Sequence, residues 1–471
     1  MFASHQIRVA TLFLTTLIAL APLCLAEQLS NQKKLRIVFI GDSITGQGGG
    51  WLNTGFVFQI KKALKKVSPQ QATELIPLGG SGSGVHSWIG HEKRSRESEQ
   101  EVFLDIKKYG LKENLGKSTD IMVIMLGMND VLAPYVGDDK ISLKKWQADY
   151  LSLITSLQAR IHPKTTAIAT ISMATEDPAS PKNQLIQRMN QLIREMAAQH
   201  HWLVLPVNTS VRKTLDHGRR INPRFHVTND FVHPNLAGHI AVAIGMLQGL
   251  GENKAAAFLE NETLQAVWQN EVKRAKKITS PTVSTPWLLA SKLNQPYWKG
   301  YQFQPDKART PIDDAIESHT DFTAAIDVGQ GQLLQWKKYQ PSINYTGQDQ
   351  AGSADFSAIT HAKIFEGGYG AQWIHIPQAA PVQIKLSSDI FAGNIHLTLW
   401  LNGKQLHQSL IKAKSPVTTI DATLQQGWNT LVFKANHRAW QWQIVVDVLS
   451  ATGTRLADLE YSAEPHPTTR K

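Results

Sequence analysis

The feature that most constrains the fold is a regular alternation of short apolar runs with amphipathic stretches over residues 35–250. Such alternation predicts a mostly parallel sheet covered by helices on both faces. Ligands of these sheets bind beyond the carboxyl ends of the strands, so we expect functional residues directly after the apolar runs. The predicted strands are Leu35–Ile40, Thr73–Leu78, Ile121–Leu126, Thr166–Ile171 and Trp202–Pro206, and the helices between them include Phe56–Lys66, Ser142–Arg160 and Asn183–His200.

The composition of the chain changes after Pro281, where proline, glycine, tryptophan and β-branched residues become frequent. The run Ile395–Leu401 alternates strictly and is followed by Asn402-Gly403, a strong signal for a two-residue hairpin turn. These features predict an antiparallel β-sandwich. Further strands are predicted at Val382–Leu386, Val417–Ile420, Thr430–Ala435 and Trp440–Val448.

A chain of 471 residues is long enough for two domains. The charged, alanine-rich stretch between the two patterns predicts a helical linker, and the polar end of the chain predicts a flexible tail. We therefore predict a signal peptide at 1–26, a parallel-sheet domain at 27–252, a linker at 253–284, a β-sandwich at 285–450 and a tail at 451–471.

The first 26 residues have the pattern of a secretory signal: Arg8 gives a positive start, Val9–Leu20 an apolar run, and Cys24–Ala26 a small-residue cleavage site. The apolar run is short for a membrane span and Pro22 interrupts it, which favours a cleaved signal over a retained anchor. Leu23 stands where a lipoprotein needs a small residue. We expect a periplasmic or extracellular protein without stable membrane insertion, which has lost its only cysteine with the signal.

The formal net charge is +11, yet no dense basic tract is present. Scattered charge of this kind, such as Lys61 and Lys62 on one predicted helix, is typical of solvated faces. Affinity for an acidic polysaccharide or an anionic cell envelope is the alternative, and no nucleic-acid partner is predicted. His86 and His91 do not form a zincin pair and no carboxylate–histidine cluster has metal spacing, so we predict no metal and no other cofactor.

A serine follows the first predicted strand, within the segment Gly41–Thr45. At a strand end, Ser43 can project its hydroxyl into the substrate crevice, and small or polar neighbours let the backbone turn tightly. Serine is a poor nucleophile until a base takes its proton. Taken alone, the segment is also compatible with an ordinary strand-to-loop turn.

A histidine and an aspartate far along the chain can supply that base. His233 lies just ahead of the apolar stretch Leu236–Leu247, which together with Pro234 predicts a helix with proline in its first turn. Asp230 lies three residues earlier and can fix the imidazole tautomer and stabilise the imidazolium formed during attack. A lone histidine before proline is more often a solvent-facing loop residue, but the aspartate at this spacing favours catalysis.

Two further strand ends offer hydrogen-bond donors for an oxyanion. The glycine-rich run Leu78–Val85 offers a backbone N–H that a ligand can approach closely, and Asn129 offers a side-chain amide. Each signal is weak alone, because glycine-rich turns are common. The glycine run lacks the lysine of a P-loop and the spacing of a dinucleotide site, and Ser43 lacks the second glycine of an α/β-hydrolase elbow.

The serine segment, the glycine-rich run, the asparagine segment and the aspartate–histidine segment follow one another along the chain. In this order they resemble the four sequence blocks of the SGNH (GDSL-type) hydrolases, and the resemblance extends over residues 35–250. It implies a flavodoxin-like three-layer sandwich with a parallel sheet, in agreement with the strand pattern. The matching blocks are Gly41-Asp42-Ser43, Gly82, Gly127-x-Asn129-Asp130 and Asp230-x-x-His233.

The resemblance also implies a role for each matching residue. Ser43 is the nucleophile, and His233 is the general base, oriented by Asp230. The backbone amides of Ser43 and Gly82 and the side chain of Asn129 form the oxyanion hole. Asp42 is then a structural residue of its block.

The second block departs from the family pattern at Pro77, where an asparagine is usual. The remaining pattern, Gly79-x-x-Gly82-x-x-Val85, fits the chain, and for this reason we choose Gly82 as the oxyanion glycine. Gly84 remains the alternative.

The second domain resembles galactose-binding-like β-sandwiches of bacterial polysaccharide-active enzymes in the segments Leu399–Lys404 and Gly427–Leu431. In the alternating strand, Trp400 points away from the face of Leu397 and Leu401, which makes it a candidate for stacking on a sugar. Core or interdomain packing is the commoner role of tryptophan and is the favoured alternative.

The constellation predicts hydrolysis of an acyl ester through an acyl-enzyme on Ser43. The family resemblance, the expected export and the appended sandwich favour acetyl esters of carbohydrates as substrates. An acyltransferase with the same triad, a lipid or aryl esterase and a non-catalytic glycan-binding protein are the alternatives.

Overall fold

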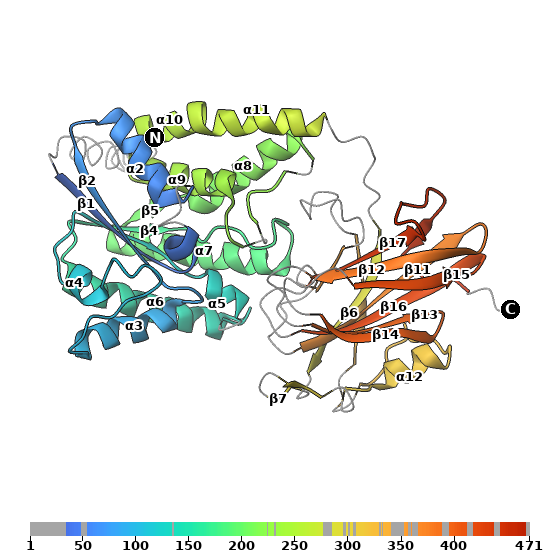
Figure 1. Cartoon of the computed structure of the whole chain (residues 1–471). Coiled ribbons are helices and arrows are strands. Elements are labelled where there is room, and N and C mark those ends of the chain that lie inside the picture. The colour runs from blue at the N-terminus through green and yellow to red at the C-terminus, as the bar shows by residue number, and fades with distance from the viewer. Residues whose placement is uncertain are drawn as a thin grey trace, which may run out of the picture. The chain divides into compact units, whose positions relative to one another are not determined.

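The protein is described by a computed structural model, in which the chain forms two compact units (Figure 1). The first unit contains most of residues 34–276 and the second most of residues 285–467. The predicted signal peptide lies outside the described residues. These are 34–48, 54–133, 136–223, 225–229, 232–276, 285–294, 298–299, 302–304, 308–328, 331, 333–340, 353–356, 359, 366–388, 395–411, 418–437 and 443–467.

A five-stranded parallel sheet forms the centre of the first unit, in the order β2-β1-β3-β4-β5. This is the flavodoxin-like strand order. Apolar residues fill both faces of its central strands, as expected for a sheet covered on both sides. The strands are β1 (Lys34–Gly41), β2 (Ala72–Gly79), β3 (Ile121–Met125), β4 (Thr165–Ala169) and β5 (Leu203–Leu205).

Helices cover both faces of this sheet, which confirms the predicted three-layer arrangement (Figure 1). Helices α2, α8, α9 and α10 pack together on one face, and α3, α4 and α6 pack together on the other. The helices are α2 (Phe56–Val67), α3 (Val85–Glu97), α4 (Leu111–Leu115), α5 (Met128–Leu132), α6 (Lys140–Ile161), α7 (Pro181–His200), α8 (Val207–Ile221) and α9 (Leu236–Gly249), with a π-helical turn η1 (Ile44–Gly48).

The stretch predicted as a helical linker is helical as far as Ala275. It consists of α10 (Asn253–Phe258), η2 (Leu259–Thr263) and α11 (Leu264–Ala275). These helices pack on α8 and α9 and form part of the first unit, because they bury Ala255, Ala256, Leu259, Leu264 and Trp268.

Two antiparallel sheets form the second unit, as the alternating pattern predicts. One sheet has the order β14-β13-β16-β11-β6-β9 with β18 also paired to β11, the other β10-β17-β12-β15, and β7 pairs with β8. The elements are β6 (Trp287–Asn294), β7 (Trp298–Lys299), β8 (Gln302–Phe303), α12 (Pro311–Glu317), β9 (Gln335–Tyr339), β10 (Ser353–Asp355), β11 (Glu366–Ile376), β12 (Ala380–Ser388), β13 (Ile395–Leu401), β14 (Lys404–Ile411), β15 (Thr418–Leu424), β16 (Gly427–His437), β17 (Gln443–Ser450) and β18 (Glu460–Ser462).

The hairpin predicted at Asn402-Gly403 joins β13 to β14. Both turn residues have positive φ, 51° and 77°, which is the backbone that makes this dipeptide favourable between two strands.

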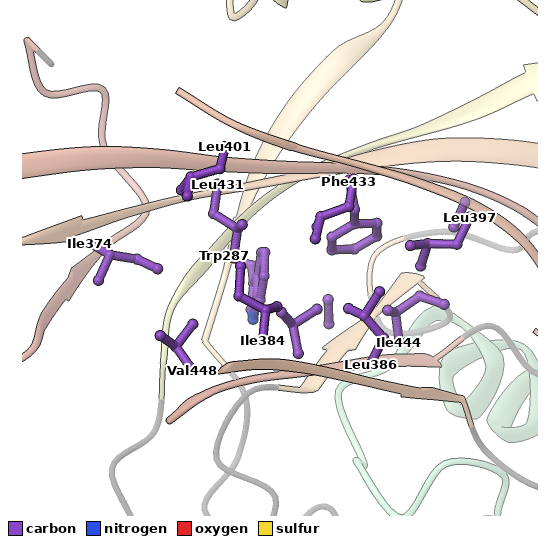
Figure 2. Packing of buried hydrophobic residues seen from close by; sticks show 14 of the residues in the cluster. Trp287, Ile374, Ile384, Leu386, Leu397, Leu401, Leu431, Phe433, Ile444 and Val448 are labelled. Atoms are coloured by element: carbon purple, nitrogen blue, oxygen red, sulfur yellow. The ribbon is translucent and has the colours of Figure 1, made fainter. Parts of the chain in front are cut away.

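The central strands β11 and β13 of the larger sheet are buried on both faces. Its inner face meets the smaller sheet in an apolar core that includes Trp287, Leu397, Leu401 and Phe433 (Figure 2). Its outer face carries a second apolar cluster, covered by Ile312 and Ile316 of α12. The alternating residues of β13 therefore point to two faces that are both buried. The sequence pattern alone would suggest one buried face and one exposed face.

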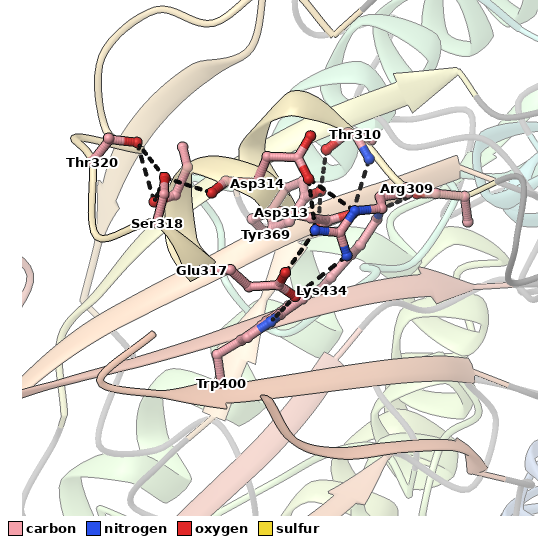
Figure 3. A network of polar contacts seen from close by, with 12 residues as sticks. Arg309, Thr310, Asp313, Asp314, Glu317, Ser318, Thr320, Tyr369, Trp400 and Lys434 are labelled. Carbon is pink, nitrogen blue, oxygen red and sulfur yellow. Dashed lines mark hydrogen bonds and ion pairs between the residues drawn. The ribbon is translucent and has the colours of Figure 1, made fainter. Parts of the chain in front are cut away.

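A buried ion pair fixes α12 on the outer face of the larger sheet (Figure 3). Lys434 of β16 donates to Asp313 at 2.8 Å and also to the carbonyl of Ala308, and its ammonium lies over the Tyr369 ring. The Tyr369 hydroxyl donates to the other Asp313 oxygen at 2.7 Å, and the backbone N–H of Thr310 donates to that carboxylate at 2.9 Å. Burial of both charges is tolerated because each has several partners.

The stretch predicted as a flexible tail contains an ordered strand. Between residues 451 and 467 the chain returns to the larger sheet, and β18 pairs antiparallel with Trp373–His375 of β11. Leu456, Leu459 and Tyr461 pack against the sandwich core, which explains the order. The sequence pattern missed this strand because its few apolar side chains are isolated within a polar stretch.

Candidate active site

The structure brings Ser43 and His233 together. Ser43 follows β1 directly, and His233 lies on the loop before α9, 190 residues later. The Ser43 Oγ lies 2.8 Å from the Nε2 of His233, a hydrogen-bonding distance. The serine residue as a whole is 8% exposed.

A tight turn after β1 presents the serine. The Asp42 carbonyl accepts from the backbone N–H groups of Thr45 and Gly46, at 3.1 and 2.9 Å, and this starts η1. A side chain at Gly41 would collide with Thr45, since a Cβ there would lie 2.1 Å from the threonine Oγ1. Trp88 of α3 fixes the strand end by donating its indole N–H to the Gly41 carbonyl at 2.7 Å.

The Asp42 carboxylate is buried beneath this turn. It accepts from the backbone N–H of Ile44 at 2.9 Å, which agrees with the structural role expected for it. Burial raises the pKa of Asp42 to about 7; the Ile44 N–H and the charge that His233 can carry oppose the rise, while the nearby Asp130 adds to it.

The loop that carries His233 closes on itself. Thr228 and Pro234 form an isolated antiparallel bridge, and the backbone N–H of Asn229 donates to the His233 carbonyl at 2.9 Å. Asn235 is the N-cap of α9, and its side chain accepts from Gly238. Pro234 therefore lies before the N-cap, whereas the sequence pattern predicted this proline in the first helical turn. The helix begins later because the side chain of Asn235 is a favourable N-cap.

Asp230, predicted to orient His233, lies outside the described residues.

The glycine-rich turn after β2 is tied to the serine turn. The N–H of Gly80 donates to the Gly41 carbonyl at 3.2 Å, and Ser81 donates both its N–H and its hydroxyl to Asp105. Gly82 has a φ of +73°, and a Cβ added there would meet no atom within 4 Å. The space into which a side chain at Gly82 would point is therefore empty.

Gly84 differs from Gly82 in this respect. A Cβ at Gly84 would lie 2.6 Å from a carboxylate oxygen of Asp130. The two oxygens of Asp130 accept from the backbone N–H of Val85 at 3.2 and 3.1 Å, so this carboxylate caps the first turn of α3. Burial raises the pKa of Asp130 to about 6, and the Val85 N–H acts in the opposite direction.

Asn129 lies beside the glycine-rich turn, at the start of α5. Its Nδ2 donates to the Ser83 carbonyl at 3.1 Å, and the residue is 6% exposed. The preceding Gly127 has a φ of +123°, and a Cβ there would lie 2.4 Å from Ile171, so the tight turn out of β3 needs glycine. The asparagine amide is thus held at the carboxyl edge of the sheet.

Trp400, the candidate for sugar stacking, is buried. Its side chain is 2% exposed in the cluster under α12, and its indole N–H donates to Glu317 at 3.1 Å (Figure 3). The ring offers no free face to a sugar, and a role in core packing replaces the stacking role. The reason is α12, which covers the outer face of the sheet and has no signature in the β13 sequence.

Two buried carboxylates near these loops were given no function from the sequence. Asp130 belongs to the third block, and its cap on α3 could not be inferred from spacing. Glu176 lies in the loop after β4, where it receives hydrogen bonds from residues 226–228. The signal for Glu176 was its place beyond a strand end, which is weak for one acidic residue.

Within the part of the chain that the structure describes, no group of three or more His, Cys, Asp or Glu side chains could hold a metal ion. In that same part, none of the helices has the length and apolar character needed to cross a membrane.

Comparison with known proteins shows which family this part of the chain is similar to. Residues 39–241 match the GDSL-like lipase/acylhydrolase family. An acetylxylan esterase of Geobacillus stearothermophilus is 23% identical over 229 residues, which are 46% of this chain and 94% of that protein.

Solved structures are similar to about half of the chain. An α/β hydrolase from the metagenome of Lake Arreo, Spain, is 21% identical with a TM-score of 0.37, covering 48% of this chain and 99% of its own. A variant of the Geobacillus stearothermophilus acetylxylan esterase is 22% identical with a TM-score of 0.36, covering 46% and 94%. Residues 39–241 thus match the GDSL-like lipase/acylhydrolase family, and this match supports an ester hydrolase activity for that part of the chain.

Proposed function

We propose that the protein hydrolyses acyl esters through a covalent acyl-enzyme on Ser43. The observation that carries the proposal is the 2.8 Å separation between the Ser43 Oγ and the His233 Nε2 at the carboxyl edge of the sheet. As the Oγ attacks the ester carbonyl carbon, Nε2 takes the hydroxyl proton. The tetrahedral intermediate then collapses, the bond from carbon to the leaving oxygen breaks, and the imidazolium returns the proton to that alcohol.

Deacylation repeats these steps with water. His233 takes a proton from the water as its oxygen bonds to the acyl carbon, and the Ser43 Oγ leaves with the proton that His233 returns. The products are a free acid and the original serine. Asp230 is the proposed partner of the imidazole on the other side, on the basis of its spacing and the family resemblance.

Stabilisation of the oxyanion is assigned to the backbone amides of Ser43 and Gly82 and to the amide of Asn129. The open space beside Gly82 supports this choice over Gly84, whose corresponding side is filled by Asp130. Asn129 has two amide hydrogens and its bond to Ser83 uses one, which leaves a donor for the developing charge.

For the substrate we propose an acetylated carbohydrate. Support comes from the related protein named as an acetylxylan esterase and from the separate β-sandwich that follows the hydrolase domain. Export to the periplasm or the cell exterior, proposed from the N-terminal sequence, would bring the enzyme to such polymers.

The proposal is tested by kinetics and product analysis together. Ser43→Ala and His233→Ala should each reduce kcat/KM toward a small acetyl ester by at least ~10³-fold while thermal unfolding stays unchanged. Near-wild-type turnover in folded Ser43→Ala would overturn the acyl-enzyme.

Mass spectrometry of acetylated xylo-, manno- and gluco-oligosaccharides should then show loss of acetyl groups with release of acetate in water. If acetate appears only on an added sugar acceptor, the enzyme is an acyltransferase. If long-chain acyl esters are strongly preferred and the glycans stay acetylated, the carbohydrate assignment is wrong.

A further inference from the structure

Two consecutive residues in the loop after β4 have left-handed backbone. Thr175 has a φ of +64° and Glu176 a φ of +45°, and both are buried. A β-branched residue with positive φ is a true outlier, and each such residue costs about 1–2 kcal/mol. Strain of this kind persists only where surrounding contacts outweigh it, and it concentrates at functional sites.

The contacts that offset this backbone strain are made by the Glu176 carboxylate, which is 0% exposed. One oxygen accepts from the backbone N–H groups of Val227 and Thr228 at 2.9 and 2.8 Å, and from the Thr228 hydroxyl at 2.6 Å. The other oxygen lies 2.9 Å from the Nδ1 of His226 and accepts from Arg219 at 3.2 Å. Arg219 also donates to the Glu176 carbonyl at 3.2 Å.

The carboxylate stays charged in this environment. Burial alone would raise the pKa of Glu176, but the hydrogen bond and charge of His226, the charge of Arg219 and the Thr228 hydroxyl outweigh it, and the pKa is lowered. A charged acceptor holds N–H donors about twice as strongly as a neutral one.

The segment that Glu176 holds is the base of the loop that carries His233. Thr228 is bridged to Pro234, and the next residue, Asn229, donates to the His233 carbonyl. The opposite strand of the loop is fixed in the same place, because Asn235 donates its N–H to the Val227 carbonyl at 2.9 Å. Displacement of Val227 and Thr228 would therefore move His233 with them.

We infer that Glu176 is a positioning residue that holds the two described sides of the His233 loop, residues 226–229 and 232–235, so that the Nε2 of His233 meets the Ser43 Oγ. The inference rests on the proposed function, which makes His233 the general base. The strained backbone at Thr175 and Glu176 directs the carboxylate into the base of the loop, and the loop in turn fixes the imidazole. A misplacement of about 1 Å at a catalytic group can cost ~10²-fold in rate.

The decisive variant is Glu176→Gln in the full-length protein. Glutamine keeps the size of the side chain but has one acceptor oxygen, so either the Val227–Thr228 donors or the Arg219–His226 donors face an NH₂ group. We expect kcat toward a small acetyl ester to fall ~10²-fold, with KM within about threefold.

Glu92→Gln is the matched control. Glu92 lies on α3, is also buried, and pairs with Arg160 at 3.3 Å and Arg96 at 3.5 Å. This substitution should lower the thermal midpoint to a similar extent but leave kcat within about threefold of the wild type. Equal loss of kcat in Glu92→Gln and Glu176→Gln would mean a general effect of stability and would overturn the positioning role.

Two milder variants keep the test decisive if Glu176→Gln does not fold. Glu176→Asp keeps the charge and should retain more kcat than glutamine, and Thr228→Val removes only the hydroxyl donor. Both should lower kcat more than KM. Wild-type kcat in both folded variants would overturn the inference.

A serine-reactive fluorophosphonate separates this inference from the proposed function. If wild-type Ser43 is not labelled, or is labelled equally fast in His233→Ala, the proposed function fails. If labelling needs His233 but proceeds at the wild-type rate in Glu176→Gln, the positioning role alone fails. Hydrogen–deuterium exchange should become faster in Glu176→Gln for peptides that cover residues 226–235, and unchanged exchange there would also contradict it.

Discussion

At the scale of single residues, Asn129 connects the glycine-rich turn to the proposed chemistry. Its amide donates to the Ser83 carbonyl, which fixes the orientation of the side chain. The second amide hydrogen points elsewhere by geometry, because the two hydrogens of an NH₂ group lie about 120° apart. A preorganised donor of this kind acts on the transition state without a cost of reorientation.

Asn129→Ala is expected to lower kcat by ~10²–10³-fold with little change in KM, as for single oxyanion donors elsewhere. Steady-state kinetics on a small acetyl ester provide the measurement, with thermal unfolding to account for the lost bond to Ser83. An unchanged kcat with a large rise in KM would instead make Asn129 a substrate-binding residue.

The buried Asp42 makes stability depend on pH. Its pKa is raised from 3.8 to about 7, so the folded protein binds this proton more tightly than the unfolded chain. The corresponding stability is fully present below about pH 3.8 and is lost as the pH rises to about 7. Asp42→Asn cannot ionise and keeps an acceptor for the Ile44 N–H.

We therefore expect the thermal midpoint of Asp42→Asn, relative to the wild type, to rise steadily between pH 4 and pH 7. Asp216→Asn, at an exposed position on α8, provides the control and should show no such trend. A constant difference between Asp42→Asn and wild type across this range would show that the carboxylate is ionised throughout.

At the scale of elements, the turn between β2 and α3 contains two glycines that are needed for different reasons. Gly82 has left-handed backbone but free space around it, whereas Gly84 has ordinary backbone but lies against Asp130. Because Asp130 caps α3, a side chain at Gly84 acts on the helix as well as on the turn.

Gly82→Ala should cost about 1–2 kcal/mol through backbone conformation alone. Gly84→Ala should lower the thermal midpoint further, since a Cβ 2.6 Å from the Asp130 carboxylate displaces the cap. Differential scanning calorimetry on the two variants measures this order. If Gly84→Ala is the milder change, the contact with Asp130 is not rigid.

Sequence pattern predicted strands β1 to β4 of the first unit well, because their apolar runs are mostly buried and a glycine or a polar residue stands at or just after each strand end. Strand β5 is weaker in this respect, since it has three residues of which only Leu205 is buried. Residue type, order and the family resemblance selected Ser43, His233 and Asn129 as candidates, and the structure brings the first two within hydrogen-bonding distance. The sequence pattern could not find Glu176, since a single acidic residue shows its partners only when the loop at 226–228 is brought against it. Nor could it find α12, whose burial of Trp400 depends on contacts distant in sequence.

At the scale of the whole molecule, each unit has its own apolar core, and the four segments that resemble the SGNH blocks lie in the first. A chain shortened to end at Lys276 should therefore fold and cleave small acetyl esters within about threefold of the full-length rate. If the second unit brings the enzyme to polymer, the shortened chain should lose much more activity on an acetylated polysaccharide, because a tethered binding site raises the effective substrate concentration.

Equal losses on the small ester and on the polymer would contradict this targeting role. Trp400→Ala in the full-length chain is the companion variant. Since the ring is buried, it should destabilise the protein by about 3–5 kcal/mol and leave affinity for polymer unchanged.

One edge of β11 is completed by two separate parts of the chain. β6 pairs with Glu366–Ala371, and β18 pairs with Trp373–His375 further along the same strand. During synthesis on the ribosome, β18 emerges after all the other described strands of its unit. Until then the backbone of Trp373–His375 is an open template to which another nascent chain can add a strand. Chains interrupted before Glu460 would thus have nearly all of the apolar core and yet be the forms most prone to aggregate.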